Sequence, residues 1–185
     1  MIELTQGLRI VTFDIETTDL DAYFGQIVCC TFKPLGKKPF TIRIDSKKNP
    51  NKRSDKWVVE QILDTLERYD VCVGWYSQIF DKRFINTRSL LNGVNRPFPL
   101  IKHRDLCLIA RAKFATRGNS LKMWSNRLRG YSDKTVTTPD IKRALIRLEP
   151  KAMNFVVEHC IIDVRETEAN YEAMLPYLSK KLEKK

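Results

Sequence analysis

The chain has 185 residues, 43% of them hydrophobic, which suffices for a single domain with a sizeable buried core. It carries 33 Lys and Arg residues against 22 Asp and Glu residues, and the formal net charge of +11 favours a polyanionic partner. The sequence contains no long apolar window that predicts a membrane span and no basic, then apolar, N-terminal signal. The five cysteines form no CxxC pair, so we expect reduced thiols and a cytoplasmic, intracellular protein without membrane contact.

The first part of the chain predicts a mixed order of strands and helices. Apolar runs rich in Ile, Val, Phe and Cys predict strands over residues 8–13, 26–32, 39–44, 71–75 and 100–104. A polar, basic segment over residues 46–56 contains Pro50 and predicts a loop. Apolar residues at helical spacing then predict helices over residues 57–69 and 80–91.

The second part of the chain predicts mostly helix. From residue 106 onward the helical pattern is broken at Gly118, at residues 130–139 and at Pro150. No linker or internal repeat divides the chain, so we expect one domain over residues 1–179, followed by a basic C-terminal tail over residues 180–185.

Three short acidic segments lie far apart in the chain. Asp14 and Glu16 are two residues apart at the end of the first predicted strand, where alternate residues point to the same face. Their carboxylates are therefore expected side by side. The second segment holds Asp81, shortly after the apolar run that ends at Trp75, and the third holds Asp163 in the last helical stretch.

A cluster of these four carboxylates would need cations. Like charges a few ångströms apart raise each other's pKa unless cations neutralise them. All-oxygen ligand sets suit Mg²⁺ or Mn²⁺ and match zinc poorly. His103 and Cys107 share one side of a possible helix, but two ligands without further partners do not predict a zinc site.

The order of the acidic segments resembles the DEDD 3′–5′ exonucleases, which include polymerase proofreading domains and several RNA-trimming enzymes. The Phe-Asp-Ile-Glu-Thr-Thr-Asp-Leu motif at residues 13–20 carries this resemblance most specifically. Residues 73–81 resemble the second motif, except that Tyr76 stands where the family usually has Asn. Residues 105–111 and 120–122 resemble the helical stretch that follows. The resemblance implies a ribonuclease-H-like α/β fold, with a mixed sheet flanked by helices in a single domain.

The third motif combines features of the two DEDD subtypes. One subtype has Tyr four residues before the last Asp, and the other has His five residues before it. Here His159 precedes Asp163 by four residues, so the spacing matches the tyrosine subtype and the residue matches the histidine subtype. The two share one face of a helix, and an unperturbed imidazole pKa of about 6.5 suits a general base. A structural role for His159 is the alternative.

The resemblance implies two-metal phosphodiester hydrolysis that releases nucleoside monophosphates, with two Mg²⁺ or Mn²⁺ and no small-molecule cofactor. Asp14 would bridge the ions, Glu16 and Asp163 would hold the ion that activates water, and Asp81 would act on the other ion. His159 would be the candidate base.

A second set of residues is expected to contact the nucleic acid. The expected substrate contacts are Ile15, Thr17, Thr18, Trp75, Tyr76 and Phe80. The backbone after Asp14 would approach the terminal nucleotide, with Thr17 or Thr18 near its sugar. The three aromatic rings offer faces for stacking, worth roughly 1–3 kcal/mol per base, although core packing is an equal alternative for Trp75 and Tyr76.

Basic residues form two clusters. Lys47, Lys48, Lys52 and Arg53 are expected in a solvated loop, whereas Arg111, Lys113, Arg117, Lys122, Arg127 and Arg129, near Trp124, are expected to follow a phosphate backbone. Binding to nucleic acid should therefore weaken with added salt.

The sequence thus predicts a metal-dependent 3′–5′ exonuclease for single-stranded or frayed DNA. No polymerase domain is visible, so the enzyme is expected to act alone or beside a replication or repair partner. An RNA-trimming exonuclease is the second hypothesis, because few contacts read the 2′-OH and the sequence does not place them. The third is a non-catalytic nucleic-acid-binding or scaffold protein with a retained fold, against which the four carboxylates count.

Overall fold

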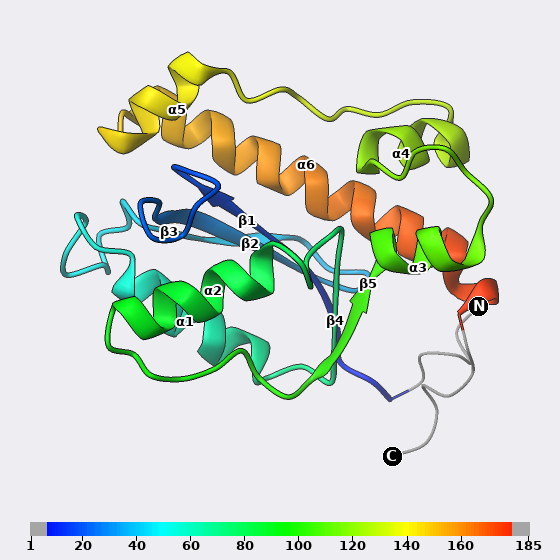
Figure 1. Cartoon of the computed structure of the whole chain (residues 1–185), viewed down its shortest axis with the longest axis horizontal. Helices are drawn as coiled ribbons and strands as arrows, with labels where there is room; N and C mark the ends of the chain where they lie inside the picture. The colour runs from blue at the N-terminus through cyan, green and yellow to red at the C-terminus, as the bar shows by residue number, and fades with distance from the viewer. Residues whose placement is uncertain (1–6, 179–185) are drawn as a thin grey trace.

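A mixed five-stranded sheet forms the centre of the computed structural model, which describes residues 7–178 (Figure 1). The strands are β1 (Ile10–Thr17), β2 (Ile27–Pro34), β3 (Phe40–Arg43), β4 (Val71–Gly74) and β5 (Lys102–Asp105). They are arranged in the order β3-β2-β1-β4-β5, with β2 antiparallel to β1 and β3, and β4 parallel to β1 and β5. This arrangement confirms the predicted ribonuclease-H-like α/β fold.

Helices cover both faces of the sheet. They are α1 (Lys56–Leu66), α2 (Asp81–Leu91), α3 (Leu106–Lys113), α4 (Leu121–Arg129), α5 (Pro139–Ile146), α6 (Pro150–Met174) and the short 3₁₀ helix η2 (Leu175–Tyr177). Figure 1 shows the long α6 along one face and α1 and α2 below the other. Among the described residues, no helix combines the length and the apolar character that a membrane span requires.

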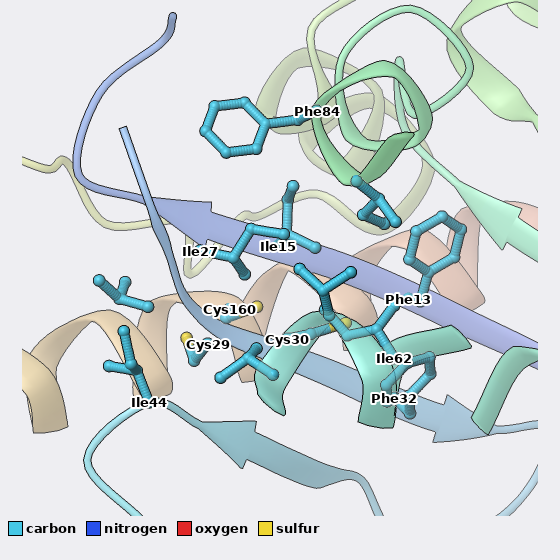
Figure 2. Packing of buried hydrophobic residues seen from close by; sticks show 14 of the residues in the cluster. Phe13, Ile15, Ile27, Cys29, Cys30, Phe32, Ile44, Ile62, Phe84 and Cys160 are labelled. Atoms are coloured by element: carbon cyan, nitrogen blue, oxygen red, sulfur yellow. The ribbon is translucent and has the colours of Figure 1, made fainter. Parts of the chain in front are cut away.

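Strand β1 supplies both the core and the acidic residues, because successive side chains of a strand point to opposite faces. Phe13 and Ile15 are buried on the face that meets α2, where Phe84 joins the same cluster (Figure 2). Asp14 points to the opposite face, where the thiol of Cys160 on α6 lies against it. Because of this alternation, the apolar side chains at the end of β1 face α2, whereas the carboxylates lie on the side of α6.

The first strand is longer than predicted. The expected strand ended at residue 13, but β1 continues to Thr17 because Asp14 and Glu16 pair with Thr31 and Cys29 of β2. A register shift between Glu16 and Thr17 then interrupts the regular pairing. The two carboxylates thus lie within a paired strand, which holds their backbone more firmly than a loop would.

The other predicted elements agree with the structure to within a few residues. The last strand runs over Lys102–Asp105 instead of residues 100–104, and α1 ends at Leu66 instead of residue 69. The predicted tail over residues 180–185 lies outside the described residues, as does the end of the predicted 1–179 domain.

The turn between β4 and α2 is held by the buried carboxylate of Asp105. Its two oxygens accept hydrogen bonds from the backbone N–H groups of Tyr76, at 3.0 Å, and Gln78, at 2.9 Å. Tyr76 has a φ of 62°, an unusual conformation for a residue other than glycine. A Cβ at Gly74 would collide with the side chain of Ser77, so this turn requires glycine there. The network fixes Tyr76 at the carboxyl end of β4.

A second buried carboxylate, that of Asp55, ties three elements together. One oxygen accepts hydrogen bonds at 2.9 Å from the backbone N–H of Ile27 and from Nε of Arg88. The other accepts from Nη2 of Arg88 at 2.8 Å and from Asn92 at 2.7 Å. The pair is shielded from solvent, so these bonds link the start of α1 to β2 and α2 without competition from water.

We predict that Asp55→Ala destabilises the fold strongly, because it leaves the Arg88 guanidinium buried without its partner. Loss of one member of a buried ion pair costs about 3–5 kcal/mol, measurable as a lower unfolding free energy in urea. Asp64→Ala is the matched control, since it removes a solvent-exposed partner of Arg96 and should cost less than about 1 kcal/mol. Equal losses in the two variants would contradict this account.

Candidate active site

One pocket collects almost all of the residues that the sequence singled out. Its volume is about 350 Å³, within the range of roughly 300–1,000 Å³ that is common for ligand pockets. It is lined by Asp14, Ile15, Glu16, Thr17, Leu20, Trp75, Tyr76, Phe80, Asp81, Leu121, Lys134, Thr137, Lys142, His159 and Asp163. Three segments far apart in the chain thus meet where β1 ends between α2 and α6.

The four carboxylates come from three elements. Asp14 and Glu16 lie on β1, Asp81 opens α2, and Asp163 lies in the middle of α6. Asp81 and Asp163 are buried, with exposed fractions of 3% and 6%. A hydrogen bond of 3.1 Å from the backbone N–H of Ile15 to Oδ1 of Asp81 joins α2 directly to β1.

Burial and mutual repulsion raise the pKa values of three of these carboxyl groups. Loss of hydration raises the pKa of Asp14 well above its usual range, and the charges of Asp81 and Asp163 raise it further. Burial, followed by the charge of Asp163, raises the pKa of Glu16 to about 8. Burial also raises the pKa of Asp81 to about 7, against the hydrogen bond from Ile15. Without added cations, this cluster therefore retains protons near neutral pH.

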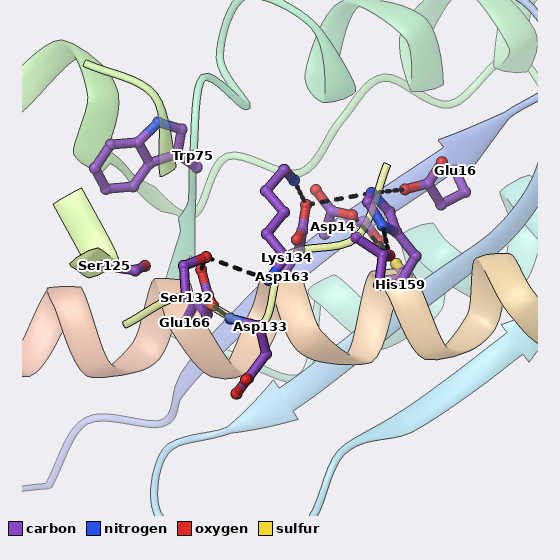
Figure 3. Close-up of polar contacts among 12 residues, drawn as sticks. Asp14, Glu16, Trp75, Ser125, Ser132, Asp133, Lys134, His159, Asp163 and Glu166 are labelled. Carbon is purple, nitrogen blue, oxygen red and sulfur yellow. Dashed lines mark hydrogen bonds and ion pairs between the residues drawn. The ribbon is translucent and has the colours of Figure 1, made fainter. Parts of the chain in front are cut away.

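Lys134 is a functional candidate that the sequence did not reveal. Its ammonium group pairs with Oδ2 of Asp163 (Figure 3). Burial lowers the pKa of Lys134, but the charges of Asp163, Asp14 and Glu16 raise it more, so the ammonium remains charged. Lys134 lies in a segment without regular structure between α4 and α5, and no motif in the sequence marks it.

The donor set fits hard divalent cations. All four acidic groups are oxygen donors, and the buried Oδ1 of Asp163 has no hydrogen-bond partner. The ammonium of Lys134 contacts the cluster, and Lys142 lies in the pocket wall. Two lysines do not balance four ionised carboxylates, so the pocket would keep an excess of negative charge. Within residues 7–178, however, no three His, Cys, Asp or Glu side chains converge at metal-binding distances.

His159 lies beside the carboxylates with its two ring nitrogens in different surroundings. Its Nε2 is 3.4 Å from Oε1 of Glu16 and 3.8 Å from Oδ2 of Asp163, whereas its Nδ1 forms a hydrogen bond with the hydroxyl of Thr135. Burial lowers the pKa of His159, so the imidazole is mostly neutral at pH 7. With the proton on Nδ1, Nε2 is an acceptor that faces the acidic cluster.

The three predicted aromatic contacts are not equivalent. Trp75 donates a hydrogen bond from its indole nitrogen to the backbone oxygen of Asn119 and packs on the second core cluster. Phe80 packs on the main core beside Phe84. Tyr76 is the most open of the three, with 37% of its surface exposed, and the guanidinium of Arg111 lies 5.3 Å from its ring centre.

The structure separates the two predicted threonine contacts. Thr17 lines the pocket with the carboxylates, but Thr18 lines a neighbouring groove. The register shift after Glu16 explains the difference, because it breaks the two-residue alternation that would place Thr18 beside Asp14 and Glu16. The sequence also did not single out Leu20, although this exposed residue stands in the pocket wall.

Glu166, one turn beyond Asp163 on α6, anchors the segment that carries Lys134. Its carboxylate accepts hydrogen bonds from the hydroxyl of Ser132 at 2.9 Å and from the backbone N–H of Asp133 at 2.7 Å (Figure 3). The side chain is buried, so water does not compete for these bonds. The next residue, Lys134, is thereby directed onto Asp163.

We predict that the metal-free protein loses stability as pH rises from about 4.5 to about 8. The raised pKa of Glu16 means that the folded state binds a proton in this range and the unfolded state does not, so deprotonation favours unfolding. Thermal unfolding in chelator at a series of pH values measures the effect. Glu16→Gln should flatten the curve, and an unchanged slope would contradict the assigned pKa shift.

We also predict that Glu166→Ala releases the Lys134 segment while the fold persists. Hydrogen exchange at the backbone amide of Asp133 should accelerate at least about tenfold, because its buried acceptor is removed. Glu158→Ala, at an exposed position of the same helix, is the matched control and should leave this exchange rate unchanged. Unchanged protection of Asp133 in Glu166→Ala would contradict the anchoring role.

Comparisons with known proteins identify the family of this chain. No curated protein sequence gives a significant match. In structure the chain is similar to the family B DNA polymerase from the hyperthermophilic archaeon Pyrobaculum calidifontis, with a TM-score of 0.69 and 18% identity. The match covers 92% of this chain and 25% of the polymerase, so the chain spans about a quarter of that protein. The RNase_H superfamily model matches residues 11–175, and the chain therefore belongs to the RNase_H superfamily.

Proposed function

We propose that this protein is a metal-dependent 3′–5′ exonuclease that hydrolyses single-stranded or frayed DNA to nucleoside monophosphates. The observation that carries the proposal is the meeting of four carboxylates, from three elements, with a neutral histidine in one pocket. The resemblance of the acidic motifs to DEDD exonucleases supports the direction of cleavage. Membership of the RNase_H superfamily supports nuclease chemistry as the general class. We assign the activity to residues 1–179.

The proposed cofactors are two Mg²⁺ or Mn²⁺ ions, held by Asp14, Glu16, Asp81 and Asp163. When bound, such ions lower the pKa of the attacking water and neutralise charge on the phosphate and the leaving 3′ oxygen. The raised pKa values of Glu16 and Asp81 mean that these two groups release protons as cations bind. Ion binding should therefore strengthen as pH rises toward about 8.

His159 is the proposed general base. A neutral imidazole can accept a proton, and the lowered pKa of His159 keeps it neutral at pH 7. Thr135 holds Nδ1, which leaves Nε2 directed toward Glu16 and Asp163, where the attacking water would be positioned. Lys134 is proposed to add positive charge beside Asp163, where the phosphate charge grows during the reaction.

The rest of the pocket is proposed to hold the terminal nucleotide. The buried Ile15 and Thr17 present backbone and hydroxyl groups next to the carboxylates, while Trp75, Tyr76 and Phe80 line the wall on the α2 side. Of these rings, Tyr76 offers the most accessible surface for a base. Thr18 is proposed to contact the strand from the neighbouring groove.

DNA is the proposed substrate because the chain shares its fold with part of a family B DNA polymerase. The same likeness supports a replication or repair protein as a partner. The 2′-OH would be read by contacts in the pocket, so matched DNA and RNA strands provide the direct comparison.

We predict that the wild-type protein shortens a 5′-labelled single strand from its 3′ end only when Mg²⁺ or Mn²⁺ is present. Asp14→Asn and Asp163→Asn should lose at least about 10³-fold in rate, because each removes a charged metal ligand. Gel time courses on DNA and RNA of matched sequence measure the reaction and identify the preferred strand.

Asparagine is neutral and has nearly the same shape as aspartate. Asp14→Asn and Asp163→Asn therefore relieve repulsion among the carboxylates, and circular dichroism should show both variants folded. Full activity in chelator or in Asp14→Asn would contradict the metal assignment. Absence of hydrolysis with retained strand binding by the wild type would instead support a non-catalytic nucleic-acid-binding protein.

We predict that His159→Gln lowers the single-turnover rate by about 10²–10⁴-fold, because it removes the proton acceptor. Substrate binding should change little. The pH profile of the wild-type rate should show the ionisation of His159 below pH 7, and the profile of the variant should lack it. Thr135→Val tests the hydrogen bond to Nδ1 separately and should give a smaller loss. If the rate of His159→Gln stays within about threefold of the wild-type rate, His159 has a structural role and is not the base.

A further inference from the structure

A second groove lies next to the candidate active site. Its volume is about 560 Å³, larger than that of the carboxylate pocket. The groove is formed by three segments: the loop between β1 and β2, the loop before α1, and the end of α5. None of the predicted catalytic residues lines it.

The groove and the active-site pocket share two walls. Thr17, the last residue of β1, and Leu20 in the β1–β2 loop line the pocket, whereas Thr18 and Asp19 of this loop line the groove. On α5, Lys142 lines the pocket and Ile146, one turn further along the helix, lines the groove. The two cavities are therefore consecutive along the space between this loop and α5, and a chain that ends in one can continue into the other.

The β1–β2 loop is rigidly braced from within. The hydroxyl of Thr17 donates to the backbone oxygen of Asp19, and the backbone N–H of Gln26 donates to the hydroxyl of Thr18 at 3.0 Å. The buried Arg88 supports the loop from below through a 3.1 Å hydrogen bond to the backbone oxygen of Ala22. These bonds hold the backbone of the loop in a defined conformation.

The tip of this loop presents two aromatic rings to solvent. Tyr23 and Phe24 are 69% and 76% exposed, and their rings meet edge to face at 5.0 Å. Exposed aromatic side chains on a preorganised loop lose little entropy on binding. They provide stacking surfaces for unpaired bases of any sequence.

The groove is also strongly basic. Lys52, Arg53 and Arg147 line it, against a single carboxylate, that of Asp19. Within residues 7–178, Lys52 and Arg53 make no ion pair, and Arg147 pairs at 3.5 Å with Glu149, where both side chains are largely exposed. These cations remain available to phosphates, and their combination with an exposed Phe24 matches single-stranded nucleic acid better than an apolar peptide.

We propose that this groove binds the part of the strand that lies 5′ to the scissile phosphate. Phe24 stacks on an unpaired base of this strand, while Lys52, Arg53 and Arg147 contact the phosphates of the strand. The proposal rests on the proposed exonuclease function, because it places the 3′ end at the carboxylates. It adds a length requirement, since only strands that extend beyond the pocket reach the groove.

The test is equilibrium binding of fluorescent oligothymidylates, measured by anisotropy in EDTA so that metal-dependent hydrolysis is absent. One strand has about three nucleotides and fits the pocket, and the other has about twelve and also spans the groove. The variants are Phe24→Ala and the pair Arg53→Ala with Arg147→Ala. The pair Lys37→Ala with Lys38→Ala is the control, because it removes the same charge from an exposed turn that lines neither cavity.

We expect the wild type to bind the longer strand at least about tenfold more tightly than the shorter one. Each groove variant should weaken binding of the longer strand about tenfold and change binding of the shorter strand less than about twofold. The control pair should have a clearly smaller effect on the longer strand. Three outcomes would overturn the proposal: the groove variants lose the same affinity for both strands, they lose none, or the control pair loses as much as they do. The groove would then bind a partner other than this strand.

The same strands, incubated with Mg²⁺, separate this proposal from the exonuclease proposal. Length-dependent binding through the groove without shortening of either strand would refute the exonuclease and retain the groove as a nucleic-acid site. Shortening of both strands at rates that the groove variants do not alter, together with unaltered binding, would refute the groove alone.

Discussion

Repulsion among four crowded carboxylates, of which Asp81 and Asp163 are buried and Asp14 and Glu16 half-buried, is the constraint on which the site depends. Such a cluster costs free energy unless protons or cations neutralise it, and the raised pKa values of Asp14, Glu16 and Asp81 express that cost. The fold sustains the cluster by building it on rigid elements. Glu16 lies in a paired strand, Asp81 is bonded to the backbone of β1, and Asp163 lies on the longest helix. We infer that divalent cations bind these carboxylates, neutralise their charge and so offset the free-energy cost of their repulsion.

Helix α6 connects this cluster to the rest of the molecule. It covers one face of the sheet and buries Cys160 against Asp14, while His159 and Asp163 face the pocket from the same helix. One turn further, Glu166 fixes the segment that delivers Lys134. A single helix thus sets the positions of Asp163, His159 and Lys134, so small shifts of α6 would change all three together.

Regular periodicity predicted the strands, the helices and two local pairs of residues, whereas the resemblance to DEDD exonucleases implied the ribonuclease-H-like fold and the meeting of Asp81 and Asp163 with Asp14 and Glu16. Alternation along β1 places Asp14 beside Glu16, and the four-residue spacing places His159 beside Asp163. The sequence missed Lys134 because residues 131–138 have no regular structure and are placed by a tertiary contact to Glu166. It did not separate Thr17 from Thr18, because the irregularity in strand pairing after Glu16 has no local sequence signal. Periodic elements were therefore predictable, and segments fixed by single long-range contacts were not.

The central claim is that these four carboxylates form a binding site for divalent cations. Anomalous X-ray diffraction from crystals equilibrated with Mn²⁺ tests it most directly, because manganese is located independently of any activity. We predict strong anomalous peaks in the pocket lined by Asp14, Glu16, Asp81 and Asp163, and their loss in crystals of Asp14→Asn. Absence of manganese from the pocket, with Lys134 still paired to Asp163, would contradict it.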